Sequence, residues 1–170
     1  MAVLFDASFL IPLLDAKVKL GSTPDAKLAH LLITLEKARE KILIPTPALS
    51  EVLVNADEAA PQYLEFLNKT RVFEIVPFDQ LAAVEVAESM RIAKQQGNKR
   101  GGTNSTWRKA KFDQQIVAKA KVKGARVVYS DDGDIEHYLK GTSIEVINFS
   151  KLPLPPEKAQ TELKFEVPDA

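Results

Sequence analysis

The sequence predicts an α/β fold, an α/β/α sandwich around a central, mainly parallel sheet of about five strands. Short apolar runs alternate along the chain with segments of helical periodicity. The chain has 170 residues, of which 45% are hydrophobic and 27% charged, which is typical of a soluble globular domain with its own core. Strands that alternate with helices favour a parallel sheet with both faces covered.

The predicted strands are short runs rich in β-branched and aliphatic residues. They cover residues 2–5, 41–45, 72–76, 126–129 and 144–149.

The helices are predicted from start signals and apolar faces. Thr23-Pro24 and Thr46-Pro47 each place a capping residue before a proline at the first helical position. Asp79 is a candidate cap for a helix that runs to about Gln96, where a glycine follows. A further helix, with Asp113 one residue inside it, carries the apolar face Phe112, Ile116, Val117 and Ala120.

Two segments are predicted to lie outside this alternation. Residues 95–109 contain three glycines and no periodicity, so they predict a mobile loop before the helix of Asp113, with residues 97–111 as an insertion. The stretch from Pro153 onward contains four prolines. We therefore expect one domain over residues 1–150 and an extended arm or tail over residues 151–170.

The composition excludes several classes of function. The formal net charge is zero, so the protein as a whole is not a basic nucleic-acid binder, and contact with RNA would need a local patch. The absence of cysteine excludes disulfides, thiolate metal sites and cysteine nucleophiles, and two histidines make a zinc site improbable. Neither a signal peptide nor a bilayer-spanning apolar run is visible, so we expect a cytoplasmic protein without membrane contact.

Acidic residues follow the predicted strands. These are Asp6 after the first run, Glu51 in the helix after the second, Asp113 in the helix before the fourth, and Asp131, Asp132 and Asp134 after the fourth. Ligands of open parallel sheets bind at the carboxyl ends of the strands, so acids from distant parts of the chain can meet at this edge. Such a cluster is costly unless cations neutralise it, and oxygen-only ligands suit Mg²⁺ or Mn²⁺.

Each acid also has a purely structural interpretation. Asp6 suits a turn at the end of a strand, Glu51 suits a solvated helix surface, and Asp113 can complement a helix dipole. The acids after Ser130 can form an Asx-type turn or cap a short helix. Each of these readings is the better one for its residue alone, whereas the ordered set favours one shared site.

Three segments, VLFDASFLIPLL, ILIPTPALSEVLV and KFDQQIVAKAKVKGARVVYSDDGDI, together resemble the PIN domain family over roughly residues 1–150. That family comprises metal-dependent nucleases, many of them toxins of VapBC-type toxin–antitoxin pairs. Its motifs match Asp6 with Ser8, then Glu51, then Asp113, then Ser130 with Asp132 and Asp134.

The resemblance implies a ribonuclease whose catalytic residues Asp6, Glu51, Asp113 and Asp132 hold one or two Mg²⁺ or Mn²⁺ ions, with Asp134 as an auxiliary ligand. Ser8 and Ser130 would orient the carboxylates, although a helix cap and a turn explain them equally well. The resemblance also implies RNA as substrate, an antitoxin as a possible partner that covers the acidic site, and a homodimer.

An RNA substrate needs positive charge beside its phosphates. The candidates are Lys99, Arg100, Arg108, Lys109 and Lys111, which the sequence places in the loop next to Asp113. Trp107 among them could stack on an unpaired base, or fold onto the core, which is the more common fate of a lone tryptophan.

Two competing functions are consistent with parts of the pattern. Haloacid-dehalogenase-like phosphatases also carry a strand-end aspartate as nucleophile, but their chemistry needs a second acid two residues later, where this chain has Ser8. A catalytically silent PIN-like scaffold that binds RNA or protein would be indicated by loss of acids, and all four are present here.

Overall fold

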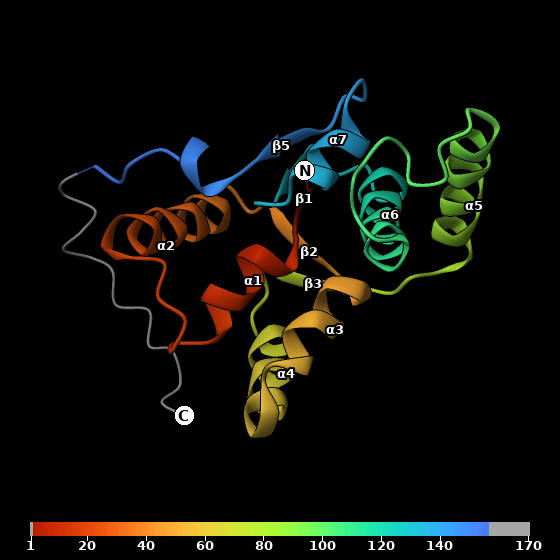
Figure 1. The fold of residues 1–170 in the computed structure, drawn as a ribbon. Coiled ribbons are helices and arrows are strands. Elements are labelled where there is room, and N and C mark those ends of the chain that lie inside the picture. The colour runs from red at the N-terminus through yellow and green to blue at the C-terminus, as the bar shows by residue number, and fades with distance from the viewer. Residues whose placement is uncertain (1, 157–170) are drawn as a thin grey trace.

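The computed structural model describes residues 2–156 and contains five strands in one parallel sheet (Figure 1). The strands are β1 (Ala2–Phe5), β2 (Lys41–Pro45), β3 (Phe73–Val76), β4 (Val127–Tyr129) and β5 (Glu145–Ile147). Their order is β3-β2-β1-β4-β5, and all four neighbouring pairs are parallel. The sequence prediction of a five-stranded parallel sheet is confirmed.

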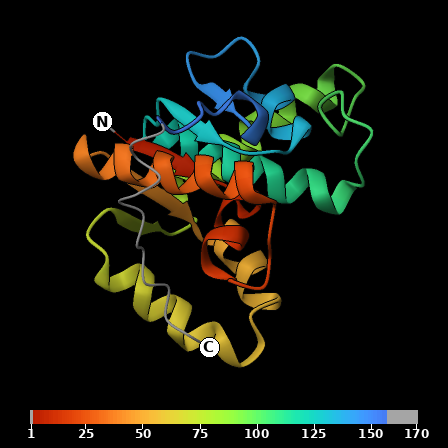
Figure 2. The ribbon, with the colours of Figure 1, turned by 90° about the vertical axis from the view of Figure 1, so that its left-hand side faces the viewer.

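Seven α-helices connect the strands. They are α1 (Ala7–Leu14), α2 (Ser22–Lys37), α3 (Thr46–Val54), α4 (Ala60–Lys69), α5 (Gln80–Gln95), α6 (Trp107–Val122) and α7 (Gly133–Leu139), with short 3₁₀ turns at Asp57–Ala59 and Phe149–Lys151. The chain moves outward from β1 to β3 and then crosses to β4 and β5. Right-handed crossovers therefore place α1–α4 on one face and α5–α7 on the other. In Figure 1, α2 lies to the left of the strands and α5 and α6 lie to the right, and Figure 2 shows α4 below the strands.

The central strand β1 forms the middle of the core. Val3, Leu4 and Phe5 have no exposed surface, as expected for a strand covered on both faces. The Phe5 ring meets Phe9 and Tyr129 edge-on, with centroids 5.6 and 5.3 Å away, and Phe9 stacks on Phe149 at 3.9 Å. This aromatic cluster joins the first strand to the last turn and fixes the carboxyl ends of β1 and β4 side by side.

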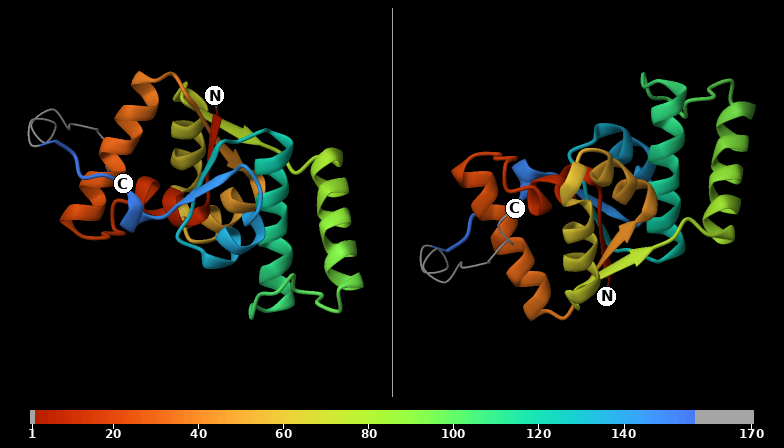
Figure 3. Two further views of the ribbon diagram at one scale, coloured as in Figure 1. Left: turned by 90° about the horizontal axis from the view of Figure 1, so that it is seen from above. Right: turned by 90° about the horizontal axis from the view of Figure 1, so that it is seen from below.

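Helices α5 and α6 lie side by side at one flank of the molecule, with α5 outermost (Figure 3). Asp79 caps α5 by accepting a hydrogen bond from the Ala82 N–H at 3.0 Å, which confirms the predicted start of this helix. The Lys119 ammonium of α6 is fully buried and lies 2.8 Å from the same Asp79 carboxylate. Only Ala82 and Ala93 of α5 are buried, so α5 is held mainly by α6.

The predicted position of Asp113 near the start of its helix is wrong. Helix α6 begins at Trp107, six residues before Asp113, and the predicted loop over residues 97–111 therefore ends at Thr106. Thr106 caps the helix by accepting a hydrogen bond from the Lys109 N–H at 3.3 Å. Residues 107–122 contain neither glycine nor proline, so nothing in them prevents a helix that starts at Trp107.

The glycine-rich loop between α5 and α6 is tied to α7. The Tyr138 hydroxyl donates to the Arg100 carbonyl at 2.9 Å, and His137 Nε2 lies 2.8 Å from the Gly101 carbonyl. Gly101 and Gly102 adopt positive φ angles of 64° and 94°, and a Cβ on either would lie 2.8 Å from the Tyr138 or His137 ring. The glycines therefore allow this close approach, and the loop has a defined path across α7.

Helix α4 was not anticipated from the sequence. The predicted arm over residues 151–170 lies largely outside the described residues, although Leu152 at its beginning is buried in the core.

Candidate functional site

The predicted acids gather at the carboxyl edge of the sheet, around the point where β1 lies between β2 and β4. Asp6 follows β1 directly, Ser130 follows β4, and Glu51 lies on α3, which starts as β2 ends. The chain leaves β1 toward one face of the sheet and β4 toward the other. In open parallel sheets, a crevice forms between the carboxyl ends of two such neighbouring strands. Strand direction alone therefore brings these acids to one place.

Asp6 is held by hydroxyl groups. Its Oδ2 accepts hydrogen bonds from Ser130 Oγ at 2.9 Å and from Ser8 Oγ at 3.2 Å. Each hydroxyl in turn accepts a backbone N–H from the loop after β4, Ser8 from Asp131 and Ser130 from Asp132, both at 3.0 Å. The two serines therefore fix the Asp6 carboxylate to that loop.

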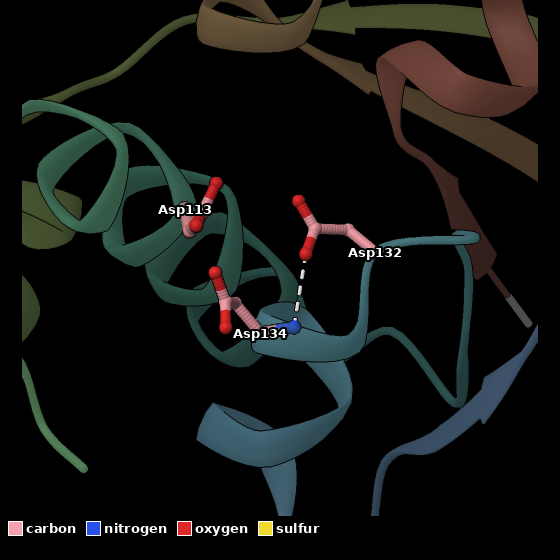
Figure 4. Close-up of side chains that lie close together, drawn as sticks. All are labelled: Asp113, Asp132 and Asp134. Atoms are coloured by element: carbon pink, nitrogen blue, oxygen red, sulfur yellow. Dashed lines mark hydrogen bonds between the residues drawn. The ribbon is translucent and has the colours of Figure 1, made fainter. Parts of the chain in front are cut away.

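Three more carboxylates converge from two helices and a loop. Asp113 lies on α6, Asp134 on the first turn of α7, and Asp132 at the cap position before α7. One oxygen from each lies within 4.8 Å of the others, and Figure 4 shows the three side chains directed into a common space. Asp132 Oδ1 also accepts the Asp134 N–H at 2.9 Å, which fixes these two acids relative to one another.

A lysine occupies the centre of this group. Lys109 Nζ lies 2.8 Å from Asp113, 2.5 Å from Asp132 and 2.8 Å from Asp134. Lys109 is one helical turn before Asp113, so the two side chains extend from the same face of α6. The sequence prediction assigned Lys109 to the RNA-contacting loop, whereas the structure places its ammonium among the carboxylates.

The charges of the site shift several pKa values. Burial raises the pKa of Asp113 to about 6, although Lys109 opposes this shift. Burial likewise raises the pKa of Asp6 against the hydrogen bonds of Ser130 and Ser8. Burial alone would lower the pKa of Lys109, but its hydrogen bonds to the three carboxylates outweigh this effect and raise it. One ammonium therefore leaves the negative charge of the site incompletely balanced.

Glu51 belongs to the same edge but not to the tight group. Burial raises the pKa of its carboxyl, and the charges of Asp6, Asp113 and Asp132 raise it further. Its oxygens, like those of Asp6, lie outside the set of three that come within 4.8 Å. The structure therefore places all the predicted acids together, with the tight set of three on one side.

The three aspartates after Ser130 have different roles. Asp131 points away from the site, because its Oδ1 accepts the Phe149 N–H at 3.0 Å and so anchors the last turn to the sheet edge. Ser105, which was not predicted as a site residue, donates a hydrogen bond to Asp134 Oδ2. Burial alone would raise the pKa of Asp134, but the contacts from Lys109 and Ser105 lower it. No sequence signal singled out Ser105, because its loop carries no recognisable motif.

The remaining predicted RNA-contacting residues lie around the beginning of α6. Trp107 has 43% of its surface exposed, so it does not fold into the core, and Lys111 Nζ lies 5.5 Å from its ring centroid. Arg108 is exposed on the same turn, and Lys99 and Arg100 are exposed in the preceding loop. These residues form a basic surface beside the acidic group.

This arrangement of strand-end acids agrees with the comparison of the sequence with known families. The sequence profile described as the PIN domain matches residues 3–140. The chain belongs to the PIN domain family. The match includes Asp6, Glu51, Asp113, Asp132 and Asp134, so all the predicted acids fall within the PIN domain. Among curated proteins, the sequence finds no match.

Solved PIN structures share the fold at low sequence identity. VapBC2 from Rickettsia felis, bound to a DNA fragment from its promoter, is 14% identical with a TM-score of 0.62, and the match covers 87% of this chain and 98% of that one. VapBC-1 from nontypeable Haemophilus influenzae is 12% identical with a TM-score of 0.58, covering 89% and 100%. VapC20 from Mycobacterium tuberculosis, a toxin that cleaves the sarcin-ricin loop, is 15% identical with a TM-score of 0.54, covering 84% and 98%.

Among residues 2–156, no helix combines the length and the apolar composition needed to cross a lipid bilayer.

Proposed function

We propose that this PIN domain protein is an endoribonuclease that depends on Mg²⁺ or Mn²⁺. The observation that carries the proposal is the group of Asp113, Asp132 and Asp134, whose oxygens come within 4.8 Å of one another beside Asp6 and Glu51. Carboxylates at this spacing repel one another unless a cation lies between them. In open parallel sheets the carboxyl edge of the strands is where ligands bind.

The residues present fit a hard divalent cation. The donor set is all oxygen, and the Lys109 ammonium already stands where positive charge is most favourable. Asp6, Glu51, Asp113, Asp132 and Asp134 are the residues that would hold one or two ions. When bound, such an ion lowers the pKa of a water molecule and stabilises charge on the phosphate oxygens.

The chain itself would orient the ligands and bind the substrate. Both serines donate to Oδ2 of Asp6 and so fix the direction of this carboxylate toward the crevice. Ser105 fixes Asp134 in the same way from the loop between α5 and α6. The exposed cations Lys99, Arg100, Arg108 and Lys111 would attract the RNA backbone, and Trp107 would contact a base.

The VapBC relatives support a finer proposal. Because those structures are of toxin–antitoxin systems, we propose that this protein is a toxin, forms a homodimer and is covered at its acidic site by an antitoxin. An arginine or lysine of that partner could neutralise the carboxylates in place of the metal. Co-purification with a small partner and a dimeric mass in solution would support this proposal.

The competing functions have less support. Phosphatase chemistry of the haloacid-dehalogenase kind would use Asp6 as a nucleophile and would leave Glu51 and Asp113 without a role. A silent scaffold would not need the tight group of acids around Lys109. The observation that favours a nuclease over both is that every acid of the PIN motifs lies at one edge.

Cleavage of single-stranded RNA in the presence of Mg²⁺ or Mn²⁺ is the direct test. We expect Asp113→Asn to lower turnover by on the order of a hundredfold or more, because losing a ligand misplaces an ion that the transition state needs. The matched control is Asp131→Asn, an acid of the same region whose carboxylate bonds Phe149 instead. We expect this control to retain activity close to that of the wild type.

All three proteins are purified in parallel, so that a contaminating ribonuclease would cleave RNA equally in the three preparations. Equal cleavage by the wild type and Asp113→Asn, or cleavage that persists in EDTA, would refute the catalytic assignment and favour the scaffold.

A further inference from the structure

We propose that a hollow beside Trp107 binds an unpaired nucleotide of the RNA, away from the acidic site. The hollow lies between the second half of α5 and the start of α6, with a volume of about 440 Å³, and is lined by Met90, Arg91, Lys94, Lys99 and Trp107. We call it the Trp107 hollow. The proposal rests on the ribonuclease function above and adds to it a subsite and a preference for single-stranded substrate.

The lining of the Trp107 hollow combines an aromatic face with positive charge. Trp107 is 43% exposed, which is unusual for so large an apolar side chain. Bases of single-stranded nucleic acids stack on such rings irrespective of sequence, while cations bind the backbone. The Met90 thioether adds a polarisable apolar wall.

The charge of the Trp107 hollow is not neutralised by nearby acids. Arg91 is paired with Glu88, but Lys94 and Lys99 form no ion pair within residues 2–156. The Lys111 ammonium, 5.5 Å from the Trp107 ring centroid, adds a third cation. Three ammonium groups around one exposed indole match the phosphates on both sides of a stacked base.

The surface between the Trp107 hollow and the acidic site suits an RNA strand. Trp107 and Asp113 are separated by about 9 Å along the α6 axis and by about 120° around it. The exposed residues on the wider side between them are Arg108, Lys109, Lys111 and Phe112, the last 41% exposed. Cations and a second exposed ring therefore lie on the path from the hollow to the carboxylates.

The geometry thus favours nucleic acid over a protein occupant. A docking site for a protein would be larger and more apolar at its centre, with charged residues depleted. Here the hollow has one indole and one thioether among three cationic side chains. An RNA duplex would not bind in the Trp107 hollow, because its bases are stacked inside the helix and cannot reach the indole ring.

Trp107 is the single tryptophan of the chain, so its fluorescence reports directly on the hollow. A single-stranded hexauridylate is titrated into the wild-type protein in EDTA, where metal-dependent cleavage does not occur. We expect saturable quenching by this oligonucleotide, and none by inorganic phosphate or by a blunt RNA duplex at the same phosphate concentration. Absence of quenching, or equal quenching by the duplex, would overturn the proposal.

Variants test the two components of the subsite, with binding followed by the anisotropy of a labelled hexauridylate. We expect Trp107→Ala to weaken binding about tenfold and Trp107→Phe to restore most of it. We expect the pair Lys94→Ala and Lys99→Ala to weaken binding and to reduce the slope of log affinity against log salt by about 1.4. The matched control is the pair Lys17→Ala and Lys19→Ala, which removes the same charge from the exposed connection between α1 and α2.

Circular dichroism melts of each variant establish that it is folded. Unchanged affinity in folded Trp107→Ala, or an equal loss in the control pair, would refute the Trp107 hollow as a subsite. Cleavage assays of the same proteins separate the two proposals. Quenching without cleavage would reject the ribonuclease function and retain the subsite, whereas cleavage without quenching would reject the subsite alone.

Discussion

The two sides of the acidic site are held in different ways. Asp6 is fixed by two neutral hydroxyls, Ser8 and Ser130, which connect it to the backbone after β4. Asp113, Asp132 and Asp134 are held together by a single ammonium, that of Lys109. Both arrangements satisfy carboxylates at the same edge of the sheet, but the physical consequences for a bound cation differ.

Hydroxyl donors can remain in place when a cation binds, because they leave the charge of the carboxylate unchanged. An ammonium competes with the cation for the same oxygens and the same electrostatic potential. The hydroxyl-held side is therefore organised in advance, whereas the lysine-held side must exchange one positive charge for another. We therefore expect added metal to change the stability of variants at Ser8 or Ser130 differently from that of variants at Lys109.

The largest effect is expected for Ser130→Ala. Ser130 is 1% exposed and its hydroxyl makes two hydrogen bonds, so its removal takes one donor from Asp6, which keeps Ser8, and leaves the Asp132 N–H without its partner. We expect the free energy of unfolding to fall by about 1–3 kcal/mol. Urea denaturation in EDTA and in Mn²⁺ should give similar losses, because the hydroxyl acts in both states.

Ser8→Ala provides the graded comparison. The Ser8 hydroxyl is more exposed, and its bond to Asp6 is longer at 3.2 Å, so we expect about half the loss or less. A loss for Ser130→Ala that disappears in Mn²⁺ would contradict the hydroxyl-held description of Asp6.

The next effect is expected for Lys109→Met, which removes the ammonium but keeps much of the side-chain length. Without metal, three carboxylates would face one another, so we expect a lower melting temperature in EDTA. With Mn²⁺ the difference should shrink, and Mn²⁺ affinity measured by calorimetry should rise on the order of tenfold, because no internal charge competes.

Lys119→Met is the matched control, since Lys119 is an ion-paired lysine of the same helix that contacts Asp79 rather than the site acids. We expect this variant to lose stability equally in EDTA and Mn²⁺. An unchanged response of Lys109→Met to metal would mean that Lys109 does not compete with the cation.

The smallest effect is a pH dependence of the metal-free protein. Burial raises the pKa of Asp113 to about 6 from an ordinary value of 3.8. The folded state therefore holds a proton that the unfolded state has lost between these pH values, and stability falls as pH rises through this window. Well below pH 3.8 the carboxyl is protonated in both states and contributes no difference.

We expect Asp113→Asn to remove this contribution. Thermal melts in EDTA from pH 4 to pH 7 should show the variant gaining stability relative to the wild type as pH rises. Asp6 and Glu51, whose pKa values are also raised, are present in both proteins, so the difference reports Asp113 together with its charge interaction with Glu51. A gain by the wild type instead would show that the ion pair with Lys109 outweighs the cost of burial.

Sequence reasoning identified the acids because strand direction, not detailed packing, brings them together. Asp6, Glu51 and Asp132 follow β1, β2 and β4, whose carboxyl ends share one edge by topology. The same reasoning failed for the start of α6, because glycine-rich composition upstream concealed a helix that begins at Trp107. That error moved Lys109 from a helix facing the carboxylates into a loop facing RNA.

The sequence by itself determined the parallel sheet, the edge at which the acids meet and the oxygen-only chemistry available there. These follow from periodicity and residue type, which are local properties of the chain. Only the tertiary structure decided three contacts of the site. Asp131 accepts a hydrogen bond from the Phe149 N–H, Ser105 donates one to Asp134, and the Lys109 ammonium lies among three carboxylates. Each of these depends on the direction of a side chain and on a neighbour brought near by folding, which neighbouring residues in the sequence do not specify.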